Sequence, residues 1–117
     1  MGQYTHEKSM AEQGSWYQVE VSGTGNSVKI PAGVTNVLMY ASGAAEVDRL
    51  QTSERSGSKI RIMARSDSST IQFNDGENIK TTGTDTSIGS WDSIEFVCSP
   101  DASGTLFFIE TNLSNIS

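Results

Sequence analysis

The sequence predicts an all-β protein, an antiparallel β-sandwich or jelly-roll-like fold of about eight or nine strands. Apolar residues recur at every second position in short runs, for example at Ile60, Ile62 and Ala64. This period of two is typical of strands that place one face on a core. Clusters of Gly, Ser, Asn and Asp, the residues of tight turns, separate the runs. No stretch keeps helical periodicity for longer than one turn.

The first half of the chain contains short alternating runs divided by glycine-rich turns and by Pro31, which ends ladder pairing. In the run at 35–41 we expect Val37, Met39 and Ala41 to point inward, while Leu38 and Tyr40 make the other face apolar as well. The three-residue step from Val47 to Leu50 breaks the period of two and indicates a bulge or sharp twist. The expected strands cover residues 16–22, 28–30, 35–41 and 45–51.

Residues 57–83 contain two alternating apolar runs, one at Ile60, Ile62 and Ala64 and one at Ile71 and Phe73, and we expect a hairpin to join the second run to the segment at Ile79. If Phe73 and Ile79 face each other across it, the loop between them has an odd length of three or five residues, because side-chain facing fixes the register. Two further strands are expected at 92–98 and 105–110. In the first of these, Ile94, Phe96 and Cys98 point inward and Asp92 points outward.

The 117 residues are enough for one domain with a single core. We divide them into an N-terminal arm (1–14), a β-sandwich domain (15–112) and a short C-terminal tail (113–117). The net charge of −6 argues against nucleic acid as a partner, and no apolar run approaches the ~20 residues of a membrane span. The arm is polar and contains acids, unlike a signal peptide, so we expect a soluble product made in a cytoplasm.

Few residues suggest catalytic or metal chemistry. His6, the only histidine, lies in the arm, whereas triads and most zinc sites need a histidine on the folded scaffold. The lone Cys98 is expected to be a small buried hydrophobe. The segment 74–78 lacks the ligand spacing of a calcium loop and is expected to be a plain turn. A carboxylate pair for glycoside hydrolysis would have to come from acids that lie beside turn residues: Asp75, Glu77, Asp85 and Asp92.

We therefore predict no enzyme, no metal and no cofactor, and a structural or binding module instead. Trp16, Tyr17 and Trp91 lie near strand ends. Such aromatic residues form either a stacking platform for sugars or a core edge or subunit contact, and both interpretations remain open.

One resemblance covers residues from about Ile30 to Thr111. The order of turns and apolar positions, including the step from Val47 to Leu50, resembles the small trimerising β-sandwich domains of bacteriophage tailspikes and tail fibres. Phe107 and Phe108 stand where that family usually has a tryptophan. The matching segments read IPAGVTNVLMYASG, AEVDRL, GSKIRIMA, STIQFNDGENIK and WDSIEFVCSPDASGTLFFIE.

The resemblance implies a virion protein. Because the chain begins with a methionine and a short arm, without a long stalk, we expect a homotrimeric capsid decoration (cement) protein. It would be assembled in the host cytoplasm and would lie on the capsid surface. There its N-terminal arm would bind the phage's major capsid protein and stabilise the capsid. The arm contacts would be Gln3, Tyr4, Thr5, His6, Glu7, Lys8 and Met10, and the trimer contacts Trp16, Tyr17, Leu38 and Tyr40.

Two alternatives are kept. In the first, the chain would be the trimerising or receptor-binding tip of a tail fibre or tailspike and would bind host glycan. In the second, it would be a glycan-binding module unrelated to phages. The second alternative requires sugar affinity that is lost when Trp16 or Trp91 is replaced.

Overall fold

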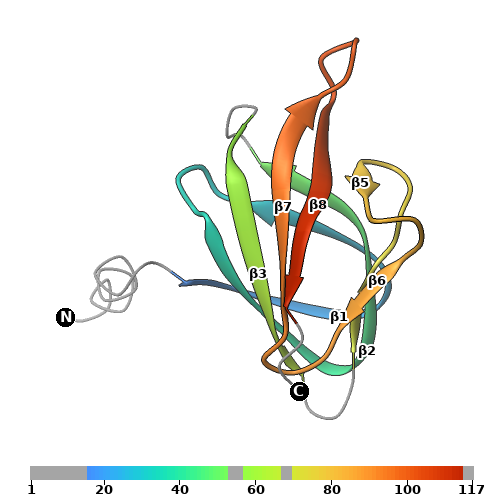
Figure 1. The fold of residues 1–117 in the computed structure, drawn as a ribbon. Coiled ribbons are helices and arrows are strands. Elements are labelled where there is room, and N and C mark those ends of the chain that lie inside the picture. The colour runs from blue at the N-terminus through green and yellow to red at the C-terminus, as the bar shows by residue number, and fades with distance from the viewer. Residues whose placement is uncertain (1–15, 53–56, 67–69, 115–117) are drawn as a thin grey trace, which may run out of the picture.

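A computed structural model describes residues 16–52, 57–66 and 70–114 of the chain. Within these ranges it contains strands and turns but no helix (Figure 1). The predicted all-β fold class is therefore confirmed. The strands are β1 (Trp16–Ile30), β2 (Asn36–Thr52), β3 (Lys59–Ser66), β4 (Ile71–Phe73), β5 (Ile79–Lys80), β6 (Thr86–Ile88), β7 (Ser93–Pro100) and β8 (Leu106–Ser114).

The strands form one sheet that curls into a half-barrel (Figure 1). Its order is β5-β8-β7-β3-β2-β4-β6, and β1 pairs with β2 beside this path. The pairing is mixed, whereas the sequence had predicted an antiparallel arrangement. The pairs β3–β7, β4–β6 and β7–β8 are antiparallel, and the pairs β1–β2, β2–β3, β2–β4 and β5–β8 are parallel.

Parallel pairing of consecutive strands arises because the long strands bend. β1 spans two predicted strands and turns a corner at Gly23 and Gly25, whose φ angles of 66° and 76° suit glycine. Because of this bend, the end of β1 leads the chain back to the start of β1. The first residue of β2, Asn36, then pairs with Trp16, and the two strands run in the same direction. β2 likewise merges two predicted strands, and β3 and β4 pair with its two halves. The first half of the protein is thus a spiral of parallel turns.

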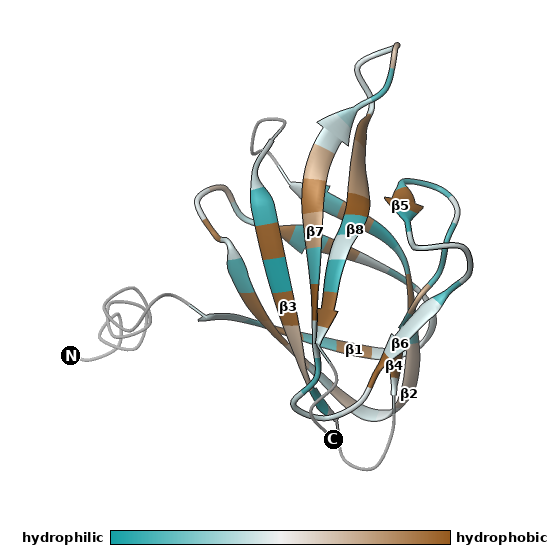
Figure 2. Ribbon diagram, in the orientation of Figure 1, coloured by the Kyte–Doolittle hydropathy of each residue, from teal (hydrophilic) through white to brown (hydrophobic). Residues whose placement is uncertain are grey.

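The core lies inside this curl, and the predicted inward faces are confirmed. Val37, Met39, Ile94 and Phe96 are fully buried, as is Cys98 apart from 1% of its surface. The ring of Phe96 packs edge-on between two others, with centroid distances of 5.5 Å to Phe73 and 6.5 Å to Phe108. The alternation of apolar and polar residues is visible along β3 (Figure 2).

The predicted irregularity between Val47 and Leu50 is confirmed. Val47 pairs with Asn26 and Leu50 with Val28, so the register shifts between Asn26 and Ser27. One extra residue on β2 lets both Val47 and Leu50 reach the core, where neither is exposed.

The predicted hairpin between Phe73 and Ile79 is wrong, although both residues are buried. β4 pairs with β2 and β6, while β5 pairs with β8. The buried Asn78 explains the separation. Its side-chain amide donates to the Leu50 carbonyl at 2.5 Å and accepts from the Leu50 amide at 3.2 Å, and its own carbonyl accepts from the Phe108 amide at 2.8 Å. Asn78 thereby holds β5 between β2 and β8.

Two smaller expectations also need correction. Asp92 is 5% exposed and not outward-facing, because its carboxylate accepts a hydrogen bond from the Gly89 amide at 2.9 Å. β8 continues to Ser114, so the expected tail at 113–117 begins within a strand. The predicted arm, 1–14, lies outside the described residues.

Candidate functional site

The outer face of β1, β2 and β3 brings together side chains that alternate with the core positions. The pairing places Glu20 beside Tyr40 and Tyr40 beside Arg65. The next row of the same face joins Gln18, Leu38 and Met63, and the row after that joins Trp16, Asn36 and Arg61. Arginines and aromatic residues therefore lie side by side across three strands.

Trp91 stands at the edge of this face in an unusual backbone conformation. Its φ angle is +75°, and it is the only residue other than glycine with positive φ in the part of the chain that the structure describes. This conformation is uncommon for a bulky side chain. The turn that holds it is well bonded: the Trp91 amide donates to the Ala64 carbonyl at 2.7 Å, and the Ala64 amide donates to the Asp92 carbonyl at 3.0 Å. The fold thus fixes an indole that is 50% exposed.

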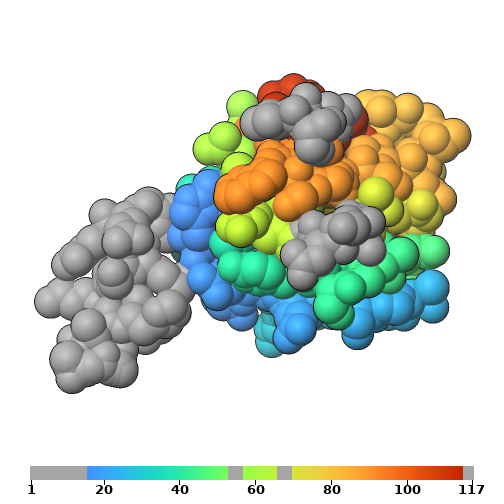
Figure 3. Space-filling view, turned by 90° about the horizontal axis from the view of Figure 1, so that it is seen from below, coloured from blue at the N-terminus to red at the C-terminus, as the bar shows by residue number. Residues whose placement is uncertain are grey.

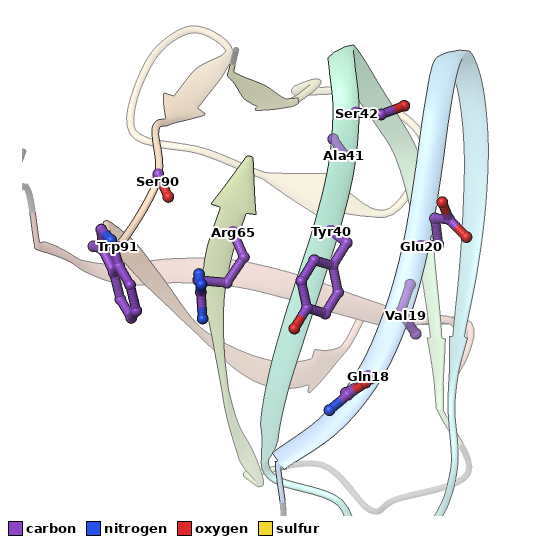
Figure 4. Close-up of a pocket in the computed structure, with 9 residues that line it drawn as sticks. All are labelled: Gln18, Val19, Glu20, Tyr40, Ala41, Ser42, Arg65, Ser90 and Trp91. Carbon is purple, nitrogen blue, oxygen red and sulfur yellow. The ribbon is translucent and has the colours of Figure 1, made fainter. Parts of the chain in front are cut away.

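Arg65 stacks on this indole. Its guanidinium carbon lies 3.9 Å from the centroid of the Trp91 ring, within the range of a cation–π contact. Figure 4 shows Trp91, Arg65 and Tyr40 in a row, each from a different segment of the chain, with Gln18 on the β1 side. Tyr40 is 37% exposed. The row is therefore open to a ligand from outside.

A cleft of about 660 Å³ lies over this row, a size suited to a small ligand. Seen from below, β1 and the turn before β7 lie on opposite sides of β2 and β3 (Figure 3). The cleft is lined by Gln18, Val19, Glu20, Tyr40, Ala41, Ser42, Arg65, Ser90 and Trp91.

The polar groups of the cleft suit recognition of a neutral or charged polar ligand. The Arg65 guanidinium and the Glu20 carboxylate form no hydrogen bond or ion pair with the described residues, among which Arg49 and Glu77 form the one ion pair. The cleft lining contains no histidine and no cysteine. No group of metal-ligating side chains occurs among the described residues, and no helix there is long and apolar enough to cross a membrane.

The predicted site residues fall into three groups. Trp16, Leu38 and Tyr40 lie on the outer face. Tyr17 pairs with the buried Val37 and therefore lies on the opposite face of the sheet. Trp91 joins the outer face from the turn before β7. The expected arm contacts lie outside the described residues: Gln3, Tyr4, Thr5, His6, Glu7, Lys8 and Met10.

The acids considered for catalysis are held by other groups of the fold. Asp85 accepts from the Asp75 amide at 2.8 Å, and Asp75 accepts from the Thr81 amide at 2.9 Å. Glu77 pairs with Arg49 at 3.0 Å, with both side chains largely exposed. Asp92 lies in the separate turn next to Trp91. Asp75, Asp85 and Asp92 therefore accept hydrogen bonds within turns, and Glu77 takes part in an exposed ion pair.

The basic residues of β3 were not among the predicted site residues. Lys59, Arg61 and Arg65 occupy alternate positions of KIRIMAR, together with Met63, and all have the parity opposite to the buried Ile60 and Ile62. The same period of two that located the core could have located this outer row.

Comparison with known proteins supplies no relative: no family model, no curated protein and no solved structure matches this chain.

Proposed function

We propose that the protein is a non-enzymatic glycan-binding module whose binding site is the cleft over Tyr40, Arg65 and Trp91. The observation that carries the proposal is the half-exposed indole of Trp91, fixed by backbone hydrogen bonds at a φ of +75°. Backbone conformations of this kind cost about 1–3 kcal/mol and cluster at binding sites. A strained, exposed tryptophan is better explained by a ligand than by packing.

The chemistry of a sugar matches the cleft. A sugar ring has apolar C–H faces that stack on flat aromatic rings and hydroxyl groups that need hydrogen-bond partners at its edge. Trp91 and Tyr40 supply the aromatic surface. Gln18 supplies a planar donor and acceptor, and Arg65 supplies planar donors. The resemblance to tail-fibre and tailspike domains supports host glycan as one source of such a ligand.

A glycan array tests the proposal. We expect labelled protein to bind a defined subset of glycans, and Trp91→Ala and Tyr40→Ala to lose that binding while retaining the β-sheet circular dichroism spectrum. Leu113→Ala is the matched control, because Leu113 is 38% exposed, similar to Tyr40, but lies on β8 outside the cleft. Absence of binding to the whole array, or binding that survives both cleft substitutions, would contradict the proposal.

A second candidate function, the homotrimeric capsid decoration protein, is favoured by one observation. Three of the four expected trimer contacts, Trp16, Leu38 and Tyr40, share the outer face of β1 and β2. A trimer through this face would cover part of the cleft, so the two candidates compete for the same surface. In this proposal residues 1–14 bind the major capsid protein.

Solution mass separates the two candidates. A trimer that Leu38→Asp converts to a monomer would support the decoration protein, and a monomeric wild type would contradict it.

Deleting residues 2–14 should abolish capsid binding and leave the trimer folded. Capsid binding by the deletion variant would rule out the role of the arm.

A further inference from the structure

The outer face of β3 concentrates positive charge in an acidic protein. The chain has a net charge of −6 and eight lysines and arginines. Six of these eight lie in the described residues, and three of the six are Lys59, Arg61 and Arg65 on β3. We call the row formed by these three residues and Met63 the basic face of β3. Its teal bands alternate with the brown core positions in Figure 2.

The cations of the basic face have no partners of opposite charge within the described residues, where the one ion pair, between Arg49 and Glu77, lies elsewhere. Among the described residues, two acids border the face. Glu95 pairs in register with Arg61, but its carboxylate instead accepts from the Thr111 hydroxyl at 3.1 Å. Glu20 points away from the row of Trp91, Arg65 and Tyr40 (Figure 4). The positive charge is therefore available to a ligand.

Each arginine of the face lies over a tryptophan, and these are the two tryptophans of the chain. The guanidinium carbon of Arg61 is 5.8 Å from the ring centroid of Trp16, and that of Arg65 is 3.9 Å from Trp91. Each end of the face is also hollowed. The large cleft lies at Arg65, and a smaller hollow of about 180 Å³ is lined by Lys59 and Arg61 together with Thr35, Asn36 and Glu95.

We propose that the ligand of this protein is an acidic oligosaccharide that lies along β3, which rests on the glycan-binding function proposed above. Its carboxylate or sulfate groups would pair with Lys59, Arg61 and Arg65, and its sugar rings would stack near Trp91 and Trp16. A strand advances about 3.3 Å per residue, so Lys59 and Arg65 are about 20 Å apart. This spacing fits an extended chain of several charged sugars better than a single small anion.

A nucleic acid is the main competitor, because it also combines negative charge with stacking rings. Proteins that bind its backbone generally neutralise several phosphates and are basic overall. A chain of net charge −6 with three cations on one strand does not fit that description. An acidic glycan is therefore the ligand that we assign to the basic face.

Matched ligands test the inference. Oligogalacturonates and heparin-derived oligosaccharides are titrated into the protein, with tryptophan fluorescence as the readout. Methyl-esterified oligogalacturonates, which have the same chain without its charge, are the control. We expect binding of at least one acidic series, affinity at least about tenfold lower for the esterified form, and weakening with added salt.

Matched variants locate the site. The triple variant Lys59→Gln, Arg61→Gln, Arg65→Gln should lose at least about tenfold in affinity for the acidic ligand. The triple variant Lys29→Gln, Arg49→Gln, Lys80→Gln has the same change of charge outside β3 and should keep the affinity. Equal losses of affinity in both variants would overturn the assignment of the binding site to β3.

The outcomes separate the two proposals. Equal affinity for acidic and esterified oligosaccharides would overturn the inference and leave glycan binding standing. Absence of binding to both series and to a glycan array would overturn both. Tighter binding of a single-stranded oligodeoxythymidine than of any acidic glycan would also overturn the inference, in favour of a polynucleotide ligand.

Discussion

Two polar surfaces of this protein contrast in how their side chains are satisfied. On one side, Asn74 of the turn after β4 donates to Glu46 at 3.0 Å and to Asp48 at 2.6 Å. Gln72 donates to Asn74 at 2.7 Å and to Asp85 at 3.3 Å. We call these five side chains the Asn74 network. On the other side, the cations of the basic face of β3 have no hydrogen-bonded partner among the described residues.

The difference shows how to separate structural polar residues from binding residues. Each carboxylate of the Asn74 network already accepts a hydrogen bond from the protein, so a ligand would have to displace an internal contact. The basic face would gain its contacts only when a ligand arrives. An internally bonded cluster should therefore matter for stability, and an unbonded one for binding. The following predictions test this contrast from the largest expected effect on stability to the smallest.

Asn78→Ala should cause the largest loss. The substitution leaves the buried amide and carbonyl of Leu50 without their partners, and each such group costs about 1–3 kcal/mol. We expect the free energy of unfolding in urea to fall by about 2–4 kcal/mol. Asn112→Ala, at an exposed position of β8, is the control and should stay within about 0.5 kcal/mol of wild type. Similar free energies of unfolding for the two variants would contradict the role of Asn78 as the link between β2 and β8.

Asn74→Ala should cause a moderate loss. It removes the amide that lies between the Glu46 and Asp48 carboxylates and leaves two like charges facing each other. Because the site is half-buried, we expect about 1–2 kcal/mol less stability by urea unfolding and unchanged ligand affinity. Reduced affinity with unchanged stability would reverse the roles assigned to the two surfaces.

Trp91→Gly should change stability little and remove binding. Glycine relieves about 1–2 kcal/mol of left-handed backbone cost. The loss of the Arg65 stack, about 0.5–1 kcal/mol at an exposed site, and of chain rigidity offsets that gain. We expect a net change within about 1 kcal/mol. Trp16→Gly, at the first residue of β1, is the comparison and should be the more destabilising. A larger loss for Trp91→Gly would identify Trp91 as a packing residue.

Asp101 should give the smallest effect, seen as a dependence on pH. The hydrogen bond from the Ser103 hydroxyl, together with the Thr105, Ser103 and Gly104 amides, lowers the pKa of Asp101 below its ordinary value of 3.8. A carboxyl whose pKa is lowered by folding stabilises the protein above its unfolded pKa. That stabilisation is lost as the pH falls through the folded pKa. Asp101 is fully exposed, so the effect is small.

The thermal midpoints of wild type and Asp101→Asn, measured as the pH is lowered through and below 3.8, check this. The wild type should lose its small advantage over the variant in that range. A constant difference between the two proteins at every pH would contradict the role given to the Asp101 carboxylate.

The sequence predicted which residues face the core but not which strands are neighbours. A period of two places Val37 and Ile94 on the inner face whatever their partners, and both are buried. Strand direction depends on the corners near Gly23, which bend one strand into a spiral. The failed hairpin has a similar cause. The apolar side chains of Phe73 and Ile79 favoured their pairing across a hairpin. Instead, the side-chain amide of Asn78 donates to the Leu50 carbonyl on β2, and its backbone carbonyl accepts from the Phe108 amide on β8.

The candidate site was predictable in part for the same reason. The sequence placed Trp91 near a strand end and Tyr40 on the face opposite the core. Arg65 alternates with the inward positions of β3, which also predicts an outer position. Their meeting depends on the parallel pairing of β2 with β3 and on the turn that brings Trp91 to Ala64. Neither contact is encoded in local spacing.

The two indole groups allow the most direct test of acidic-glycan binding at the basic face of β3. A two-dimensional ¹H–¹⁵N spectrum of the protein contains one indole N–H signal for each of Trp16 and Trp91, and side-chain amide signals for Gln72 and Asn74. On titration with the acidic oligosaccharide that binds, both indole signals should shift and saturate together, while the amide signals of the Asn74 network stay in place. Shifts confined to Gln72 and Asn74, with both indoles unmoved, would contradict the assignment of binding to the basic face of β3.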